Sequence, residues 1–177
     1  MVRKVINCTL GTIAEALNEI EQYKAQFDPK LKEFCAKLAT IGATVASIHF
    51  TRALYDGIND SKIRVEPTDT GYKIIAEGNA VAFIEFGAGV HYPDIHPKAA
   101  ELGIMHGTYG KGNGKNDYWW YTGQPGTAGG EFARDRYGRE KSNSTITHGN
   151  PANMPMYYAA KEMQERVQEI AQEVFGR

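Results

Sequence analysis

The sequence has little cysteine, no excess of one charge and no long apolar run. Its 177 residues include only two cysteines, Cys8 and Cys35, which are too few for a disulfide framework. The 20 basic and 21 acidic side chains give a formal net charge of −1, whereas a dedicated nucleic-acid-binding protein usually carries a basic face. No run reaches the roughly 18–20 apolar residues that span a bilayer. These absences predict a reduced, intracellular protein without a membrane span.

Two further signals are missing from the chain. Asn7, Thr9 and Thr12 interrupt the apolar residues that follow the basic N-terminus, so we expect no signal peptide. The stretch GTYGKGNGK lacks the G-x-x-x-x-G-K-[ST] pattern and does not lead into a helix, so it predicts no phosphate-binding loop. The sequence therefore carries no strong enzymatic signature.

Helical periodicity is present towards both ends of the chain. Apolar residues predict a first helix from about residue 12 to 26. Asp28 and Pro29 suit the start of a second helix, which we expect to reach Tyr55 before Gly57 ends it. That helix is longer than a small core needs, so we expect part of it to pack against another subunit. A third helix, from about residue 153 to 175, carries a narrow apolar seam formed by Met156, Ala160, Met163, Val167, Ile170 and Val174.

Three short segments between the helices have the patterns of strands. KIRVEP alternates with Ile63 and Val65 on one face, and YKIIAEG places Ile74 and Ala76 on one face. The turn TDTG between them predicts a hairpin. NAVAFIEFG, at residues 79–87, is apolar on both faces until Glu85, which is typical of a central strand.

The composition changes after these strands, because residues 103–149 hold 11 of the 19 glycines. We interpret residues 88–150 as an extended, glycine-rich insertion that contains one strand, around DYWWYTG. The expected fold is a single α+β domain over residues 1–177. A mainly antiparallel sheet of about four strands would pack with two N-terminal helices and one C-terminal helix.

A group of potential metal ligands follows the third predicted strand. His91, Asp94 and His96 lie within six positions, and imidazole and carboxylate groups can bind zinc or iron. Their spacing matches no metal-binding motif, because Pro93 and Pro97 interrupt any helix. His106 and His148 could join them only through the fold. We favour a polar loop surface, without metal, over a metal site.

Glu85 also allows two interpretations. It could be a general base with a raised pKa, or a strand-end glutamate that pairs with a basic group or caps the glycine turn that follows. No nucleophile or second carboxylate stands at a revealing spacing from it, so we favour the anchoring role.

Aromatic and basic residues gather in the insertion. They could offer stacking and phosphate contacts to DNA, but Arg, Tyr and Trp are also enriched at protein interfaces. The basic residues are interspersed with acidic ones, so we favour a protein interface. The candidate interface residues are Tyr118, Trp119, Trp120, Tyr121, Arg134 and Arg136.

Two separate stretches resemble the hallmarks of one protein family. AVAFIEFGAG (80–89) is similar to a strand and turn of the form (Y/F)-(V/I)-E-F-G-(T/A)-G, and THGNPANMPMYYAAKEM (147–163) to a glycine and a proline that precede P-(F/M)-(M/L/Y)-x-x-A. Both hallmarks belong to minor tail-component proteins of long-tailed double-stranded DNA bacteriophages, also called tail-completion or head–tail joining proteins. The chain departs from the pattern in its long intervening segment and in a methionine where phenylalanine is frequent. The matching residues are Phe83, Glu85, Phe86, Gly87, Gly89, Gly149, Pro151, Pro155, Met156 and Ala160.

The resemblance implies a structural virion protein of the neck or tail, with no catalysis, no cofactor and no membrane partner. Such proteins assemble as rings, for example of six or twelve subunits, between the portal or connector and the tail tube. The expected partners are further copies of the chain, connector or head-closure proteins, and tail-tube or terminator proteins. The expected location is the virion, and the host cytoplasm during assembly. Two alternatives stay open: a phage-encoded metal-dependent enzyme that uses His91, Asp94, His96 and Glu85, and a DNA-binding accessory protein.

Overall fold

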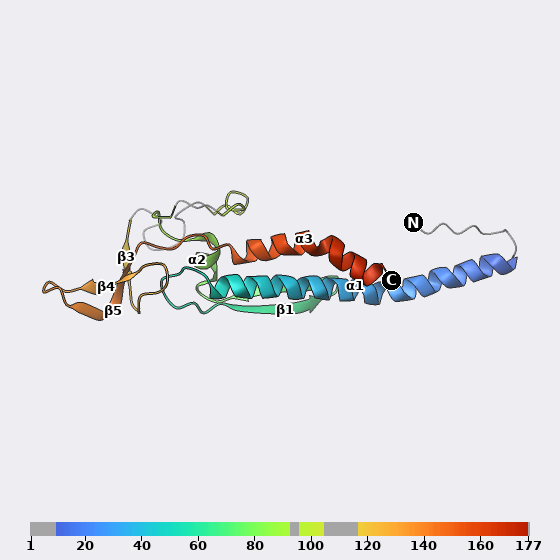
Figure 1. Ribbon diagram of the computed structural model, residues 1–177, viewed down its shortest axis with the longest axis horizontal. Helices are drawn as coiled ribbons and strands as arrows, with labels where there is room; N and C mark the ends of the chain where they lie inside the picture. Colours follow the sequence, from blue (N-terminus) through green and yellow to red (C-terminus); the bar gives the residue numbers. More distant parts are fainter. Residues whose placement is uncertain (1–9, 93–95, 105–116, 177) are drawn as a thin grey trace.

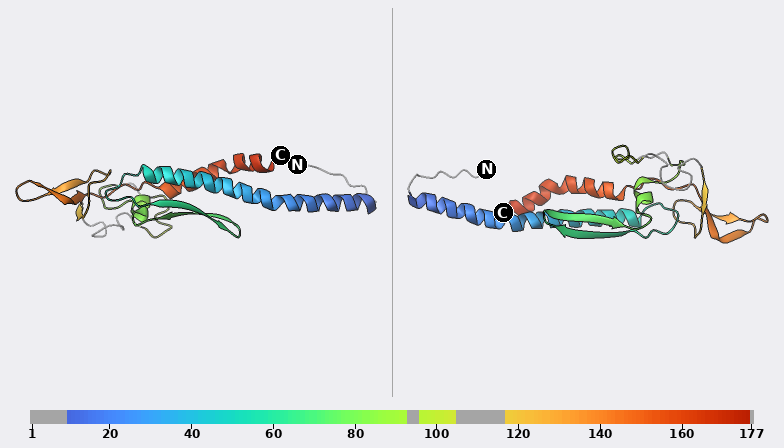
Figure 2. Two further views of the ribbon diagram at one scale, coloured as in Figure 1. Left: turned by 90° about the horizontal axis from the view of Figure 1, so that it is seen from below. Right: turned by 180° about the vertical axis from the view of Figure 1, so that it is seen from behind.

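The protein is elongated, with helices at one end and a small sheet at the other (Figure 1). The computed structural model describes residues 10–92, 96–104 and 117–176. Helix α1 (Leu10–Thr51) lies antiparallel to helix α3 (Pro155–Phe175), and the hairpin of β1 (Lys62–Thr68) and β2 (Gly71–Glu77) lies along α1 (Figure 2). The short helix α2 (Val81–Phe86) stands at the junction with the second sheet, formed by β3 (Trp119–Tyr121), β4 (Glu131–Arg134) and β5 (Glu140–Thr147). The predicted α+β class is confirmed.

The N-terminal region is one helix of 42 residues, not two. Pro29 lies inside α1, where a proline costs about 3 kcal/mol because it removes a hydrogen bond and crowds the preceding turn. Aromatic packing holds the helix together across this point. Phe27 and Phe34, on either side of Pro29, both contact the ring of Phe175, with centroids 5.9 and 5.8 Å away. The helix ends at Thr51, four residues before the expected end.

Residues 10–26 of α1, which we call the α1 arm, extend beyond the end of α3 (Figure 1). Four larger side chains of this arm are exposed: Ile13, Leu17, Ile20 and Tyr23 have exposed fractions between 43% and 68%. The remainder of α1 packs against α3 and against both strands of the hairpin. The full helix measures about 63 Å at 1.5 Å per residue, and the 17 residues of the α1 arm account for about 26 Å of that length.

Helix α1 is also long and apolar enough to cross a membrane by length and composition alone, since Ile13–Thr51 contains an 18-residue window with a mean hydropathy of 1.2. This corrects the expectation that no stretch approaches such a span. A core helix meets the same criterion, and α1 packs against α3 and the hairpin over much of its length.

The core is built mainly from small side chains. Of the thirteen apolar residues that are buried in the described part of the chain, nine are alanines. Ala46, Phe50, Ala80, Ile84 and Ala159 form its centre, where α1, α2 and α3 meet. Alanine lets two backbones approach closely, but it buries little apolar surface.

The seam predicted for α3 is partly wrong. Ala159 is buried, whereas Ala160 is exposed and Val167 has an exposed fraction of 39%. A seam whose residues are spaced alternately by four and three positions keeps facing its partner only when the helix supercoils. In a straight helix such a seam turns gradually away from the partner. The residues of α3 that are fully buried are Pro155, Ala159, Ile170 and Val174.

The predicted hairpin is confirmed, with Ile63 opposite Ala76 and Val65 opposite Ile74. The third predicted strand is wrong, because residues 81–86 form α2. The Asp60 carboxylate accepts the backbone N–H groups of Asn79 and Ala80 just before this helix, and these bonds lower the pKa of Asp60. A short apolar run fits a buried helix as well as a buried strand, and here a carboxylate lies next to the helix start, where the helix dipole favours a negative charge.

The insertion holds more structure than one strand. Strand β5 pairs with β3 on one side and β4 on the other, both antiparallel, and this sheet is separate from the β1–β2 hairpin. The sequence favoured one sheet of about four strands, but the structure has two sheets with five strands in the described residues. GTYGKGNGKND, His106 and Asp94 fall wholly or largely outside the described residues.

Candidate functional site: the junction of the two sequence hallmarks

The two stretches that carry the family resemblance meet around Glu85. This side chain projects from α2 and is only 6% exposed. Its carboxylate accepts the backbone N–H of Met156 through Oε2 at 2.8 Å and that of Tyr157 through Oε1 at 3.1 Å. Both amides belong to the first turn of α3, where N–H groups lack partners within the helix and the helix dipole favours a negative charge. Glu85 therefore anchors the start of α3.

His96 completes the surroundings of Glu85. It is 5% exposed, and its ring packs against Phe86 and Tyr157, with centroids 4.7 and 5.5 Å away. The backbone N–H of Lys98 donates to Nδ1, so the ring proton lies on Nε2 and is donated to Glu85 at 3.0 Å. In this tautomer both ring nitrogens of His96 have a hydrogen-bond partner, the Lys98 N–H at Nδ1 and the Glu85 carboxylate at Nε2.

A close crossing of two backbones lies beside this cluster. Ala88 and Asn150 exchange two hydrogen bonds, of 3.0 and 3.1 Å, and Asn150 also donates to the carbonyl of Phe83. Gly149 adopts φ +94°, and an added Cβ would lie 1.9 Å from the carbonyl oxygen of Ala88. Only glycine fits such an approach at positive φ.

The second hallmark continues along α2 and fixes the approach to α3. Asn153 donates its backbone N–H to Ile84, and Met154 donates to the carbonyl of Glu85. Met154 is the only non-glycine residue of the described chain with positive φ, at +55°, and it immediately precedes α3. The matched residues on both sides thus form one joint, except Ala160, which lies exposed on α3.

Glu85, His91 and His96 lie in different surroundings. The anchoring interpretation of Glu85 is consistent with its contacts, although the turn it holds is the start of α3 and not the glycine turn that follows it. The prediction that the histidines lie on a loop surface is wrong for His96, which is buried. His91 is exposed and contacts Asp117 and His148 instead of His96.

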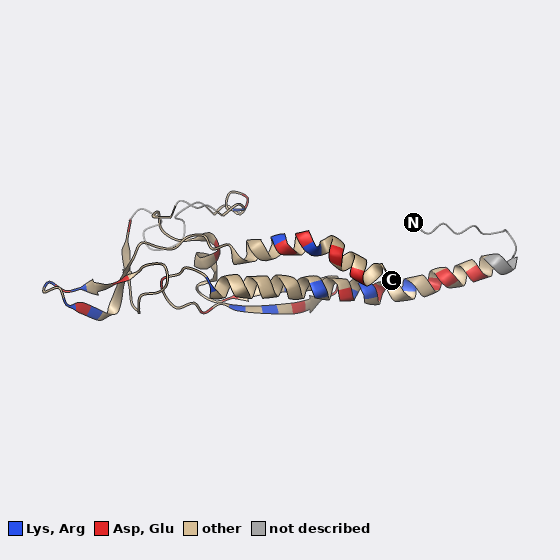
Figure 3. Cartoon of the chain, viewed as in Figure 1, with Lys and Arg blue, Asp and Glu red and all other residues tan. Residues whose placement is uncertain are grey.

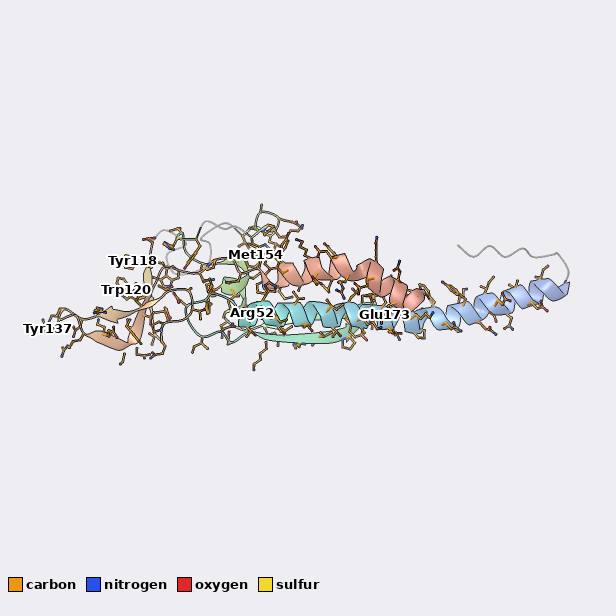
Figure 4. The ribbon with its side chains drawn as sticks, viewed as in Figure 1. Arg52, Tyr118, Trp120, Tyr137, Met154 and Glu173 are labelled. Atoms are coloured by element: carbon orange, nitrogen blue, oxygen red, sulfur yellow. The ribbon has the colours of Figure 1, made fainter. Side chains whose placement is uncertain are left out.

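The aromatic segment alternates between two environments. Trp119 and Tyr121 are half-buried and line a cavity of about 630 Å³ with Tyr55, Phe83 and Asn150. Tyr118 and Trp120 are exposed and make an edge-to-face contact at 5.2 Å (Figure 4). Half of the predicted interface residues in this segment are therefore turned towards the protein.

The basic residues of the β4–β5 hairpin are engaged locally. Arg134 pairs with Glu140, and Arg136 lies over the ring of Tyr137, 4.7 Å from its centroid. Charges of both signs mix at this end of the molecule (Figure 3). This mixture is typical of a solvated surface or a protein interface and does not form a basic face for nucleic acid.

Sequence reasoning missed Asp56, which joins the helical end to the distal sheet. Its buried carboxylate accepts the Thr147 hydroxyl at 2.8 Å and the Ala128 backbone N–H at 3.1 Å. The available signal was an acidic residue beside Gly57 at a helix end, but its partners lie more than seventy positions away.

Comparison with protein-family models, with curated proteins and with solved structures finds no match to this chain.

Proposed function

We propose that this chain is a structural protein of a bacteriophage neck or tail, acting in tail completion or head–tail joining. In this proposal it assembles as a homo-oligomeric ring between the connector and the tail tube, and it has no catalytic role. The proposal rests on the resemblance of residues 80–89 and 147–163 to the two hallmarks of that family.

One observation supports the proposal most directly. The hallmarks are about sixty residues apart in the sequence, yet they contact each other through Glu85, the Ala88–Asn150 pair and Gly149. A shared joint explains why the two motifs would occur together: a change in one removes the hydrogen-bond partners of the other. The joint also orients α3 and the distal sheet, which would carry the contact surfaces.

The α1 arm supports the assembly role. A ring closes through heterologous contacts, so each subunit needs two complementary faces. The arm offers a row of exposed apolar residues on a part of α1 that extends beyond α3, and such a row on an assembly protein suits the face of a neighbour. The exposed Tyr118 and Trp120 lie at the opposite end of the molecule (Figure 4).

The test is the mass of the protein in solution, alone and co-expressed with the products of neighbouring genes. We expect oligomers, and we expect Ile20→Glu to dissociate them because it places a charge in the apolar row. The matched control is Gln22→Glu, which adds the same charge at a position about 200° around the helix from Ile20. Both positions lie on the α1 arm, so neither variant should unfold the monomer.

A chain that stays monomeric under all these conditions would contradict the proposal. Equal dissociation by Ile20→Glu and Gln22→Glu would contradict the role of the apolar row. Assembly would then have to use another surface. Electron microscopy of the oligomer distinguishes a closed ring from an open or two-fold assembly.

A further inference from the structure

Three side chains with metal-binding atoms converge at the edge of the distal sheet. They are His91, from the segment after α2, Asp117, just before β3, and His148, just after β5. One ligand atom from each lies within 4.8 Å of the others. We propose that these three residues form a binding site for a divalent transition-metal ion of the zinc type. This inference is independent of the proposed function.

The backbone explains why these residues meet. The antiparallel bridge between Ala88 and Asn150 brings the segment that precedes His91 alongside the one that contains His148. Trp119 pairs with Thr147, so Asp117 and His148 lie at the same end of the β3–β5 pair. Two independent strand registers therefore direct the three side chains to one place.

The close approach at this point is fixed by glycine. Gly89 has φ +81°, and a Cβ there would lie 2.8 Å from the carbonyl oxygen of His148 and 3.0 Å from the Trp119 ring. The two histidine rings lie 5.3 Å apart. The close backbone packing beside His148 therefore fixes where the two rings meet, which favours a preorganised site, and the rings need only small rotations within it.

The distances suit a metal ion after small rotations. Nδ1 of His91 lies 3.9 Å from the Asp117 carboxylate, and Nδ1 of His148 lies 3.8 Å from it. Three atoms within 4.8 Å of one another all lie within about 2.8 Å of a common point, compared with roughly 2.0–2.2 Å for zinc bonds to nitrogen or oxygen. Each ligand atom therefore needs to move by less than about 1 Å.

The ligand chemistry selects the class of ion. Two imidazoles with one carboxylate suit Zn²⁺, and also Ni²⁺, Cu²⁺ or Fe²⁺, whereas Mg²⁺ and Ca²⁺ prefer sites made only of oxygen. The backbone carbonyl of Asp117 contacts Nδ1 of His148 at 3.0 Å. Binding through this nitrogen would exchange that contact for the metal. Three protein ligands leave a fourth position for water. Because the ligands come from three segments, the ion would connect the segment after α2 to the ends of β3 and β5.

The experiment is a Zn²⁺ titration of protein purified without a histidine tag and treated with chelator, in competition with a chromophoric chelator near neutral pH. We expect one Zn²⁺ per chain. His91→Ala, His148→Ala and Asp117→Asn should each weaken Zn²⁺ binding by at least about tenfold, the lower end of the losses seen for residues that only support metal ligands. Affinity should fall on acidification, because the ligands must lose protons to bind.

Two controls separate this site from other Zn²⁺ ligands. His49 stacks on Tyr158 and Cys35 lies on α1, both outside the cluster, so His49→Gln and Cys35→Ser should bind Zn²⁺ as the wild type does. Co²⁺ provides a second readout, because its visible absorption spectrum reports nitrogen and oxygen coordination and should be lost in His148→Ala. Circular dichroism verifies that each variant is folded.

Two outcomes would overturn the proposal. One is the absence of saturable Zn²⁺ binding tighter than about 100 µM, a weak affinity of roughly −5.5 kcal/mol. The other is stoichiometric binding that persists in folded His91→Ala/His148→Ala protein, which would show that the ion is held elsewhere on the chain.

Discussion

Replacement of Glu85 by glutamine tests the joint between α2 and α3. The substitution keeps the shape of the side chain but removes its charge and turns an amide NH₂ towards at least one N–H group. Three N–H donors, from Met156, Tyr157 and His96, now point at this carboxylate. Hydrogen bonds to a charged group are each worth about 1.5–3 kcal/mol, and a buried donor left without a partner costs about 1–3 kcal/mol.

We therefore expect Glu85→Gln to lower the free energy of unfolding by about 2–4 kcal/mol. That loss is a large part of the roughly 5–15 kcal/mol that stabilises a typical domain. With a urea dependence of about 2 kcal/mol per molar, the unfolding midpoint should fall by about 1–2 M. The measurement is equilibrium urea denaturation followed by circular dichroism at neutral pH.

The matched control is Glu165→Gln on the same helix that Glu85 anchors. Glu165 is 60% exposed and lies 3.8 Å from Lys161, so its loss should change the free energy of unfolding by no more than about 0.5 kcal/mol. If both variants unfold at the same urea concentration, Glu85 does not hold α3 in place. A further check is His96→Ala combined with Glu85→Gln, whose effects should fall short of additive because the two residues share a hydrogen bond.

Two further predictions concern the backbone crossing and the start of α2. Gly149→Ala should destabilise the protein by about 1–3 kcal/mol more than Gly129→Ala in urea denaturation, because both positions have φ near +95° but only Gly149 is crowded, by Ala88. Equal losses would show that conformational strain alone matters at Gly149. The Asp60 carboxylate has a lowered pKa, so its stabilising contribution is present above the ordinary value of 3.8 and is lost as pH falls through the lower folded value. The stability difference between wild type and Asp60→Asn should therefore be present at pH 7 and shrink below pH 3.8, and a difference that grows on acidification would contradict the assigned role.

The sequence predicts elements well where local patterns are complete. The first strand of the β1–β2 hairpin alternates and a glycine turn follows it, and these signals predict both strands and their hairpin. Helix α3 has helical periodicity over its whole length, and its predicted start lies two residues from the observed one. In both cases the information lies within the element itself.

The misassigned elements depend on contacts that are distant in sequence. Asp60, about twenty positions before α2, binds the backbone N–H groups of Asn79 and Ala80 that lead into this helix. Helix α1 continues through Pro29 with the help of Phe175 from the other end of the chain. Strand β5 is polar along most of its length, and its buried Thr145 and Thr147 are satisfied by hydrogen bonds to Gly123 and Asp56. A buried threonine with a bonded hydroxyl gives no apolar alternation to detect.

Only part of the candidate site could be predicted from the sequence. An anchoring role for Glu85 could be inferred because nothing around it in the sequence suggested chemistry. Its partners could not, because the N-terminus of α3 lies 71 positions away and His96 is separated from Glu85 by a proline-containing loop. His91, Asp117 and His148 come from three segments, so no spacing rule could have grouped them.

The alanine-rich core has a thermodynamic consequence for the proposed assembly. A buried methyl group contributes far less than a buried leucine or phenylalanine, and this chain holds many of its larger apolar residues, such as Leu17 and Ile20, at the surface. Neighbours that cover those residues would bind only the folded state and so add to the free energy of unfolding by mass action. The melting temperature should then rise with protein concentration. The stability of each subunit would thus depend on how many neighbours cover its exposed apolar residues.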